Sequence, residues 1–364
     1  MSFSQETSKN ACMPDPIYMP VLKGRQGEFA ALASIRPTTR QRILPMVEIV
    51  PGPADEPAAL KSVIDRTATK LRTWAGSRLL LDAGLLATDV ALTGDVGAVG
   101  YSVAGAISKG VSATPVVRLN DQERARRDAA TAHAENASGI AVRLSAEDLD
   151  EDSEDIEAGL TELLRTLGMS RADADLVLDL GVVNGDPEIR AGSRIAADVL
   201  RGLSAITEWR NIIVTAGAFP ADLSAFSPWT VGEPLRYDAA LYDRLQQRKR
   251  LGRTPTFGDY AVAHPFLATG PAVPPAPQLR YAVADRWLTL KGARNDPRSH
   301  EQFYEVCETI AQHPEFAGAA LGNADGRISD SRAHGPGNAS TWQEIGTTHH
   351  LDYVVRRLTT LGEP

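Results

Sequence analysis

The amino-acid sequence predicts an α/β protein, a (β/α)₈ barrel of the TIM type with a C-terminal β-hairpin and helix extension. Short apolar runs rich in Val, Ile and Leu recur along the chain. Each is too short for a globular helix and suits a strand that is buried on both faces of a parallel sheet. Eight such units favour a closed barrel. An open doubly wound sheet is the alternative, because both folds share this local pattern.

Eight segments are predicted as strands, and the apolar runs of five of them are followed by a charged residue, Glu48, Asp82, Arg118, Arg143 or Asp179, and then a loop signal. The eight segments are residues 21–23, 43–48, 79–82, 115–119, 140–144, 176–180, 212–215 and 257–262. The clearest helices are predicted at 57–74, 155–167 and 193–209, where apolar residues recur every three or four positions. Ligands bind at the carboxyl ends of the strands in both fold types, so the charged residues there mark a candidate site.

The predicted organisation has four parts. Residues 1–16 form a disordered N-terminus, 17–267 the barrel, 268–278 a proline-rich connector and 279–364 an extension packed on the barrel. Within the extension, the runs 279–283 and 287–290 suit a hairpin, and a helix follows at 299–312 with its apolar residues on one face. Residues 324–340 are small, polar and glycine-rich, which predicts a long mobile loop.

Composition limits the class of protein. Of the 364 residues, 43% are hydrophobic and 23% are charged, and the net charge of -8 argues against a surface built for coating nucleic acid or anionic lipid. The two cysteines lack a CxxC spacing, which fits a reducing cytoplasm without structural zinc or disulfides. We expect a cytoplasmic protein with no membrane partner, because the sequence shows neither a signal peptide nor a long apolar span.

Three carboxylates, Glu48, Asp82 and Asp179, lie at the ends of the second, third and sixth predicted strands and are candidate catalytic residues. Their oxygens could bind Mg²⁺ or Mn²⁺ for metal-assisted hydrolysis of a phosphodiester or a nucleotide. Alternatively, Arg118 and Arg143 from the intervening strands neutralise these carboxylates, or the two arginines clamp a phosphate group themselves. The loop after the eighth strand carries His264, with Asp259 upstream, as a candidate general acid or base.

Basic residues near glycines predict an anion-binding rim. Lys23 and Arg25 flank Gly24 at the end of the first strand and before a helix, where backbone N–H groups favour a phosphate; the alternative is a glycine turn with solvated cations. Lys291 and Arg327 are further candidate ligand-binding residues. The predicted loop 324–340 is expected either to close over the rim as a lid and deliver Arg327 or Arg332 to the anion, or to serve as a plain surface connector.

Two other features are assigned to structure rather than to chemistry. The pair His349-His350 is predicted to pack in the interior, because adjacent histidines on a helix point in different directions and cannot chelate one metal ion together. A helix at 237–251 has a basic end, which complements a helix C-terminus. A nucleic-acid contact there is possible but not favoured.

Two stretches resemble the phage-type beta protein family of bacteria and phages. The first is Tyr18-Met-Pro-Val-Leu-Lys-Gly-Arg-Gln-Gly-Glu-Phe-Ala-Ala-Leu32, followed by Ile43-Leu-Pro-Met-Val-Glu-Ile49. The second runs from Arg280-Tyr281 through Trp287-Leu-Thr-Leu-Lys-Gly292 to Trp342, Gly346 and His349-His350. The resemblance implies a mobile-element or phage-defence setting, with a protein partner from a defence system, and supplies no reaction. The chain is therefore expected to be either a hydrolase or a non-catalytic sensor or scaffold.

Overall fold

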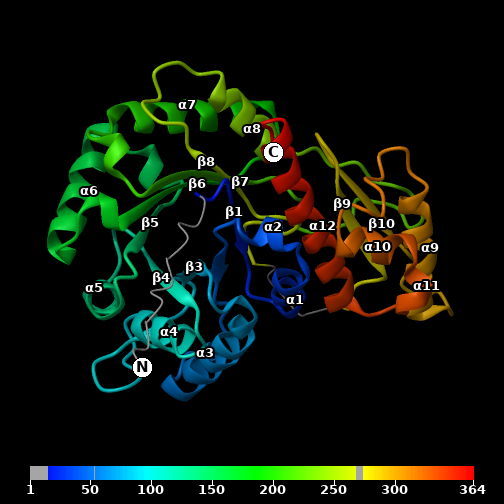
Figure 1. The fold of residues 1–364 in the computed structure, drawn as a ribbon, viewed down its shortest axis with the longest axis horizontal. Helices are drawn as coiled ribbons and strands as arrows, with labels where there is room; N and C mark the ends of the chain where they lie inside the picture. Colours follow the sequence, from blue (N-terminus) through cyan, green and yellow to red (C-terminus); the bar gives the residue numbers. More distant parts are fainter. Residues whose placement is uncertain (1–14, 53, 268–273) are drawn as a thin grey trace, which may run out of the picture.

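The computed structural model describes residues 15–52, 54–267 and 274–364. Residues 1–14 of the predicted disordered N-terminus and more than half of the predicted proline-rich connector lie outside these residues. Eight parallel strands close into a barrel (Figure 1). They are β1 (Tyr18–Leu22), β2 (Met46–Glu48), β3 (Arg78–Asp82), β4 (Ser112–Val117), β5 (Ile140–Leu144), β6 (Ala174–Val182), β7 (Asn211–Gly217) and β8 (Thr256–Asp259). β8 pairs with β1, Phe257 opposite Tyr18, which confirms the barrel over the open sheet.

Helices fill the intervals between the strands. They are α1 (Gln26–Ser34), α2 (Pro37–Arg40), α3 (Pro57–Leu71), α4 (Ala98–Ile107), α5 (Glu123–Asn136), α6 (Ser153–Leu167), α7 (Asp186–Gly202) and α8 (Tyr237–Gln246). The helix predicted at 193–209 is observed as α7, which starts and ends earlier in the chain. Pro187 fits the first turn of α7, where its missing N–H costs nothing, and the chain turns extended after Gly202 at Leu203.

Successive side chains of each strand point alternately into two apolar cores. One set of side chains, including Met19, Met46, Leu80, Val177 and Ile213, fills the barrel interior. The other set faces outward and packs beneath the helices in a larger cluster. The strands are therefore buried on both faces, which explains why they read as continuous apolar runs in the sequence.

Beyond the barrel lies a small layer with its own core. The hairpin of β9 (Gln278–Ala282) and β10 (Trp287–Lys291) forms as predicted, and α9 (Gln302–Ala311) packs on it. The prediction of a mobile lid at 324–340 is wrong. This stretch contains α10 (Asn323–Ser329) and α11 (Ser331–His334), and the buried side chains of Ala324 and Ile328 anchor it in the core of the extension.

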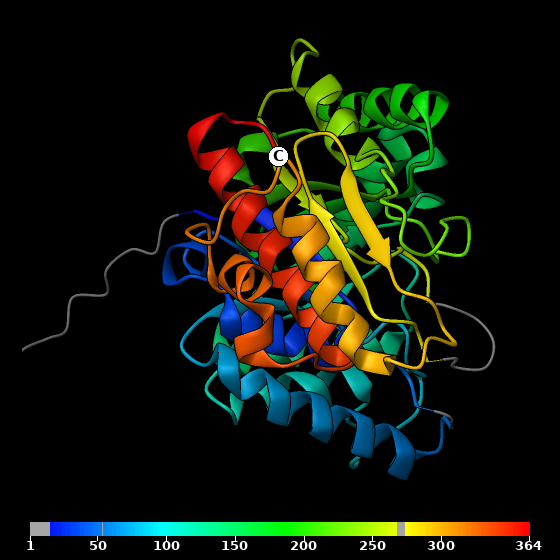
Figure 2. The same ribbon diagram turned by 90° about the vertical axis from the view of Figure 1, so that its right-hand side faces the viewer.

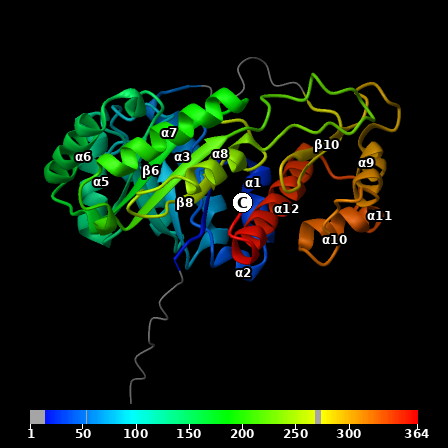
Figure 3. The same ribbon diagram turned by 90° about the horizontal axis from the view of Figure 1, so that it is seen from above.

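The last helix, α12 (Ala339–Thr360), joins the two parts (Figure 3). Its first half places Trp342 and Ile345 in the core of the extension, and its second half places Leu351 and Val354 in the core around the barrel. It packs on α1, β9, α10 and β1. Figure 2 views the molecule from the side of the extension, with α9 in front of α12. α12 thus takes the place of the eighth outer helix, and the extension is an insertion between β8 and that helix.

The loop between β7 and α8 fastens the extension to the barrel. Gly232 and Thr289 exchange two backbone hydrogen bonds of 2.8 Å, and Trp229 N–H donates to the Lys291 carbonyl. The insertion is therefore held against the carboxyl-end rim of the barrel. Within the described residues, the structure contains no helix with the length and apolar character that crossing a membrane requires.

Candidate functional site

The five predicted charged residues of the rim lie together at the carboxyl end of the barrel. Glu48 and Asp82 sit opposite each other at the ends of β2 and β3. Arg118 follows β4, Arg143 lies in β5 and Asp179 lies in β6. Their shared position follows from parallel pairing, which brings the downstream ends of all strands to one rim.

Arg143 is the centre of a buried ion network. Its guanidinium donates to Glu48 at 2.8 Å, to Asp82 at 2.6 Å and to Asp179 at 2.6 Å. The same guanidinium reaches the hydroxyl of Tyr260, which in turn donates to Asp179 at 2.6 Å. The network fills the mouth of the barrel and connects three strand-end carboxylates through one cation.

Two further cations complete the neutralisation of these carboxylates. Arg118 binds both oxygens of Asp82, at 2.7 and 3.1 Å, and Lys23 binds Glu48. Burial alone would raise the pKa of Asp82, but Arg118 and Arg143 outweigh it and hold this pKa well below its usual range. In the described part of the chain, no three His, Cys, Asp or Glu side chains converge as metal ligands would. The geometry matches the salt-bridge alternative for the rim.

In the turn around Gly24, the charged residues that were predicted to bind an anion have different surroundings from those expected. Lys23 is buried between Glu48 and the Pro265 carbonyl, so it is occupied within the protein. Glu28 accepts the Arg25 backbone N–H at 3.0 Å and places a carboxylate at the start of α1. This acid takes the position that an anion would take at the helix N-terminus. Arg25 remains exposed beside it.

Other predicted residues lie away from this network. Nδ1 of His264 accepts the backbone N–H of Phe266, and Asp259 bonds to Tyr18 and His350 instead, so the suggested acid–base partnership does not form. Arg327 pairs with Glu344 on α12 at 2.9 Å.

The histidine pair packs in the interior, which confirms its structural assignment: both side chains are fully buried, and His349 contacts a carboxylate from the extension. At the basic end of α8, Arg248 donates to Ser193 and Arg253 donates to backbone carbonyls, so both bind within the chain.

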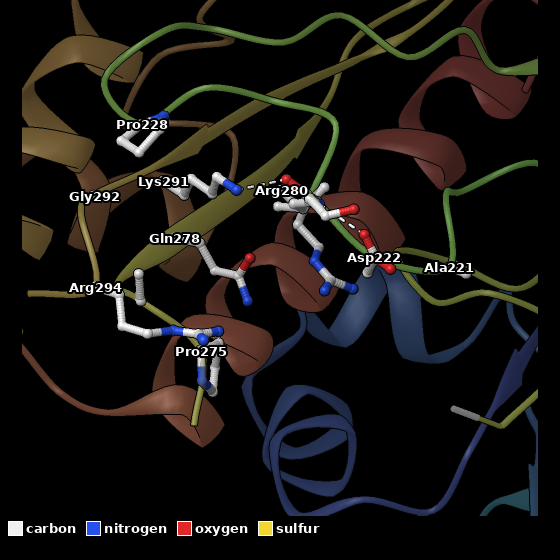
Figure 4. A pocket seen from close by; sticks show the side chains of 12 residues that line it. Ala221, Asp222, Pro228, Pro275, Gln278, Arg280, Lys291, Gly292 and Arg294 are labelled. Atoms are coloured by element: carbon white, nitrogen blue, oxygen red, sulfur yellow. Dashed lines mark hydrogen bonds between the residues drawn. The ribbon is translucent and has the colours of Figure 1, made fainter. Parts of the chain in front are cut away.

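A cavity of about 640 Å³ opens between the β7–α8 loop and the hairpin (Figure 4). Arg280, Lys291 and Arg294 point into it, with Gln278 between them and Asp222 at one side. A second cavity of about 220 Å³ continues from it, bounded by Arg25, Val262, Trp342 and Gln343. The two share Pro275, Gln278 and Arg280 as lining residues, so together they form one hollow, which we call the rim groove.

The hairpin positions these side chains through simple alternation. Lys291 pairs opposite Gln278, and Arg280 pairs opposite Thr289, so these polar residues share one face. The intervening residues, including Leu279, Tyr281 and Leu288, point the other way into the core of the extension. Arg280 and Lys291 are diagonal neighbours on this face, so their long side chains are within reach of one ligand. Lys291 was predicted as a ligand-binding residue from the sequence, whereas Arg280 and Arg294 were missed, although the alternation in 278–282 was a usable signal.

The cations of the rim groove have carbonyl partners rather than carboxylate partners. Arg280 donates to the Val262 carbonyl at 2.7 Å and stacks over Phe219, and Lys291 donates to the Leu223 carbonyl at 2.6 Å. Burial, followed by repulsion from Arg25, lowers the pKa of Arg280 to about 10. Across the residues that the structure describes, none of Arg25, Arg280, Lys291 and Arg294 forms a salt bridge. The rim groove therefore concentrates positive charge on an acidic protein.

A separate buried cluster lies between the barrel and α12. Asp259 accepts from Tyr18 and, at 2.7 Å, from His350. The guanidinium of Arg236 approaches Asp259 and Asp238 at 3.6 and 3.7 Å. Burial, opposed by Arg236 and reinforced by Asp259, raises the pKa of Asp238 to about 6. This cluster is enclosed, so we assign it to stability.

The raised pKa of Asp238 gives a stability prediction for Asp238→Asn. Between about pH 4 and pH 6 the folded protein holds a proton on this carboxyl that the unfolded chain has released, so the free energy of unfolding falls as pH rises. Asparagine has no carboxyl to titrate, so the variant does not lose this stability as the pH rises. We expect Asp238→Asn to be more stable than the parent by about 1–3 kcal/mol at pH 8 and little changed at pH 4.5, by urea unfolding. A variant less stable than the parent at pH 8 would show that Arg236 requires this charge.

No curated protein matches the sequence. Among solved structures, the chain is similar to the carboxyl transferase domain from Rhizobium etli pyruvate carboxylase with 3-bromopyruvate, at a TM-score of 0.37 and 11% identity over 93% of this chain and 48% of that chain. The same domain with pyruvate and biocytin gives a TM-score of 0.36 and 11% identity, with the same coverage. The chain thus spans about half the length of these structures.

A family model supplies the assignment. The Beta protein model matches residues 18–356, which include both stretches on which the resemblance was based, all eight barrel strands and most of α12. The match therefore extends over the barrel and the insertion together, and the chain belongs to the Beta protein family.

Proposed function

We propose that this protein is a non-catalytic binding protein that takes a phosphate-bearing ligand in the rim groove. The observation that carries the proposal is the convergence of Arg25, Arg280, Lys291 and Arg294 on one hollow where the described residues supply them with no salt-bridge partner. The hollow borders the loops after β1, β7 and β8. In (β/α)₈ barrels the loops after strands 7 and 8 often bind phosphate.

The alternative, metal-assisted hydrolysis at Glu48, Asp82 and Asp179, has less support. A hard cation needs carboxylate oxygens that are free to coordinate it. Here each carboxylate accepts from Arg143, and two of them also bind Arg118 or Lys23. Opening this network for a metal would leave buried cations without partners, which costs several kcal/mol.

The family resemblance suggests where such binding would matter. We propose that the protein acts as a sensor or scaffold subunit in a mobile-element or phage-defence setting, where ligand binding in the rim groove is passed to a protein partner. The surface for that partner is expected on the extension, because the insertion both lines the groove and borders α12.

The binding proposal is tested by titrating the protein with pyrophosphate in a calorimeter. We expect Arg280→Ala to weaken binding by about 10- to 100-fold and the double variant Arg280→Ala/Lys291→Ala to weaken it further, since each removes a charge-assisted contact. The control is Lys109→Ala, an exposed cation that lies outside the groove, and it should leave binding unchanged. Equal affinity of the double variant and the parent, or no binding of pyrophosphate by the parent, would refute the proposal.

A further inference from the structure

The two cavities of the rim groove differ in chemistry. The larger one has Lys291 and Arg294 beside Arg280, and its cations suit several phosphate oxygens. The smaller one, of about 220 Å³, is bounded by Arg25 and the shared Arg280, but it also has apolar walls from Val262 and Trp342 and the amide side chains of Gln278 and Gln343. Amides carry both donors and acceptors, which is what the edge of a nucleobase requires.

From this difference we infer that the ligand is a nucleotide, with its base in the smaller cavity and its phosphates in the larger cavity. The inference rests on the proposed phosphate binding and adds the class of ligand. A cavity of about 220 Å³ is below the usual size of a complete small-molecule site, whereas the larger cavity of about 640 Å³ is within that range. The smaller cavity therefore suits one flat part of a ligand rather than a whole ligand.

Arg280 connects the two cavities and is held in place for this purpose. Its guanidinium is fixed by the Val262 carbonyl and by the face of Phe219, with its charge centre 4.7 Å from the ring centroid. A preorganised, planar guanidinium loses little freedom when it binds an oxyanion. Among the residues that the structure describes, Arg280, Lys291 and Arg294 line the larger cavity, whereas Arg25 is the one cation that lines the smaller cavity alone, so the positive charge is concentrated at the end proposed for the phosphates.

The amides of the smaller cavity are held on two elements. Gln278 belongs to β9 and Gln343 to α12, which crosses α1 so closely that a Cβ on Gly27 would lie 2.6 Å from the Ser340 carbonyl and 2.8 Å from the Cβ of Gln343. This close approach fixes the stem of Gln343 at the cavity wall. A long nucleic-acid strand is less suited to the site, because the four groove cations lie on a protein whose net charge is -8.

The test compares each nucleoside triphosphate with tripolyphosphate, the same charged group without a base, in metal-free buffer. For the parent protein we expect at least one nucleoside triphosphate to bind 10-fold or more tightly than tripolyphosphate. Gln343→Ala should reduce this advantage to less than about threefold while leaving the tripolyphosphate affinity unchanged. Arg280→Ala/Lys291→Ala should weaken both ligands together.

Two outcomes separate this inference from the proposed function. Equal affinities for tripolyphosphate and all four nucleotides would overturn the nucleotide inference and leave phosphate binding in place. Binding of neither ligand by the parent would overturn both. Thermal unfolding of each variant, together with the conservative variant Gln343→Asn, shows whether a loss of binding reflects loss of the amide or loss of the fold. If Gln343→Ala is destabilised and also loses its preference for a nucleoside triphosphate over tripolyphosphate, Gln343→Asn decides between the two causes. A Gln343→Asn variant that keeps none of this preference would contradict the inference.

Discussion

Arg143→Met is expected to lower the free energy of unfolding by about 3–5 kcal/mol at pH 7, because it leaves buried carboxylates without their shared cation. Glu48, Asp82 and Asp179 all accept from this one guanidinium, and the Arg143 side chain is only 8% exposed. Methionine restores much of the volume and none of the charge. Urea unfolding followed by circular dichroism gives the change directly.

The pH dependence identifies the cause of this loss. A depressed pKa for Asp82 stabilises the fold above the unfolded pKa of about 4, and this stabilisation disappears as pH falls below it. The deficit of Arg143→Met should therefore stay close to its full size from pH 7 to about pH 5 and narrow as the pH falls below about 4. The matched control is Arg165→Met, which breaks an exposed pair with Glu162 and should change nothing measurable. A deficit of constant size across this range would point to lost packing instead of lost charge pairing.

Asp259→Asn is expected to lower the free energy of unfolding by about 2–4 kcal/mol at pH 7. The carboxylate accepts from Tyr18, His350 and the Ala261 backbone, and it faces the buried Arg236. Asparagine keeps the shape but removes the charge, so the guanidinium loses one of its two acidic neighbours. Denaturant titration at constant ionic strength measures the loss.

Tyr18→Phe is the control for this variant, since it removes one hydrogen-bond donor and no charge, and it should cost about 1 kcal/mol. Asp238 provides a second readout. Removing its like-charged neighbour should lower the pKa of Asp238, so the window in which stability falls with rising pH should move to lower pH. A cost no larger than that of Tyr18→Phe would contradict the charge-based account.

The barrel could be predicted because its strands have a strong local signature. A strand such as β5, buried on both faces, reads as a run of apolar residues, and its observed bounds, Ile140–Leu144, agree with the predicted segment. The rim position of Glu48, Asp82 and Asp179 follows from the same reasoning, since parallel strands share their carboxyl end.

Pairing between distant side chains could not be predicted in the same way. The sequence shows that Arg143 and the carboxylates share a rim, but the choice between a metal site and an ion network depends on side-chain reach across the barrel. The lid was mispredicted because glycines and polar residues hid two short helices whose few buried side chains, such as Ile328, fix them in place. The role of α12 was missed because a whole insertion separates it from β8.

The position of α12 sets an order on the assembly of the molecule during synthesis. The ribosome makes α1 early, yet the partner that covers its flank, residues 339–360, emerges only after the entire insertion. Until then, the growing chain exposes the seam between its first and last strands. The hairpin, α9 and α10 are made before then, but their core is complete only when α12 adds Trp342 and Ile345. α12 thus covers the seam where β8 pairs with β1 only after the insertion has been made, and apolar surface at that seam stays open to a chaperone for most of the synthesis of the insertion.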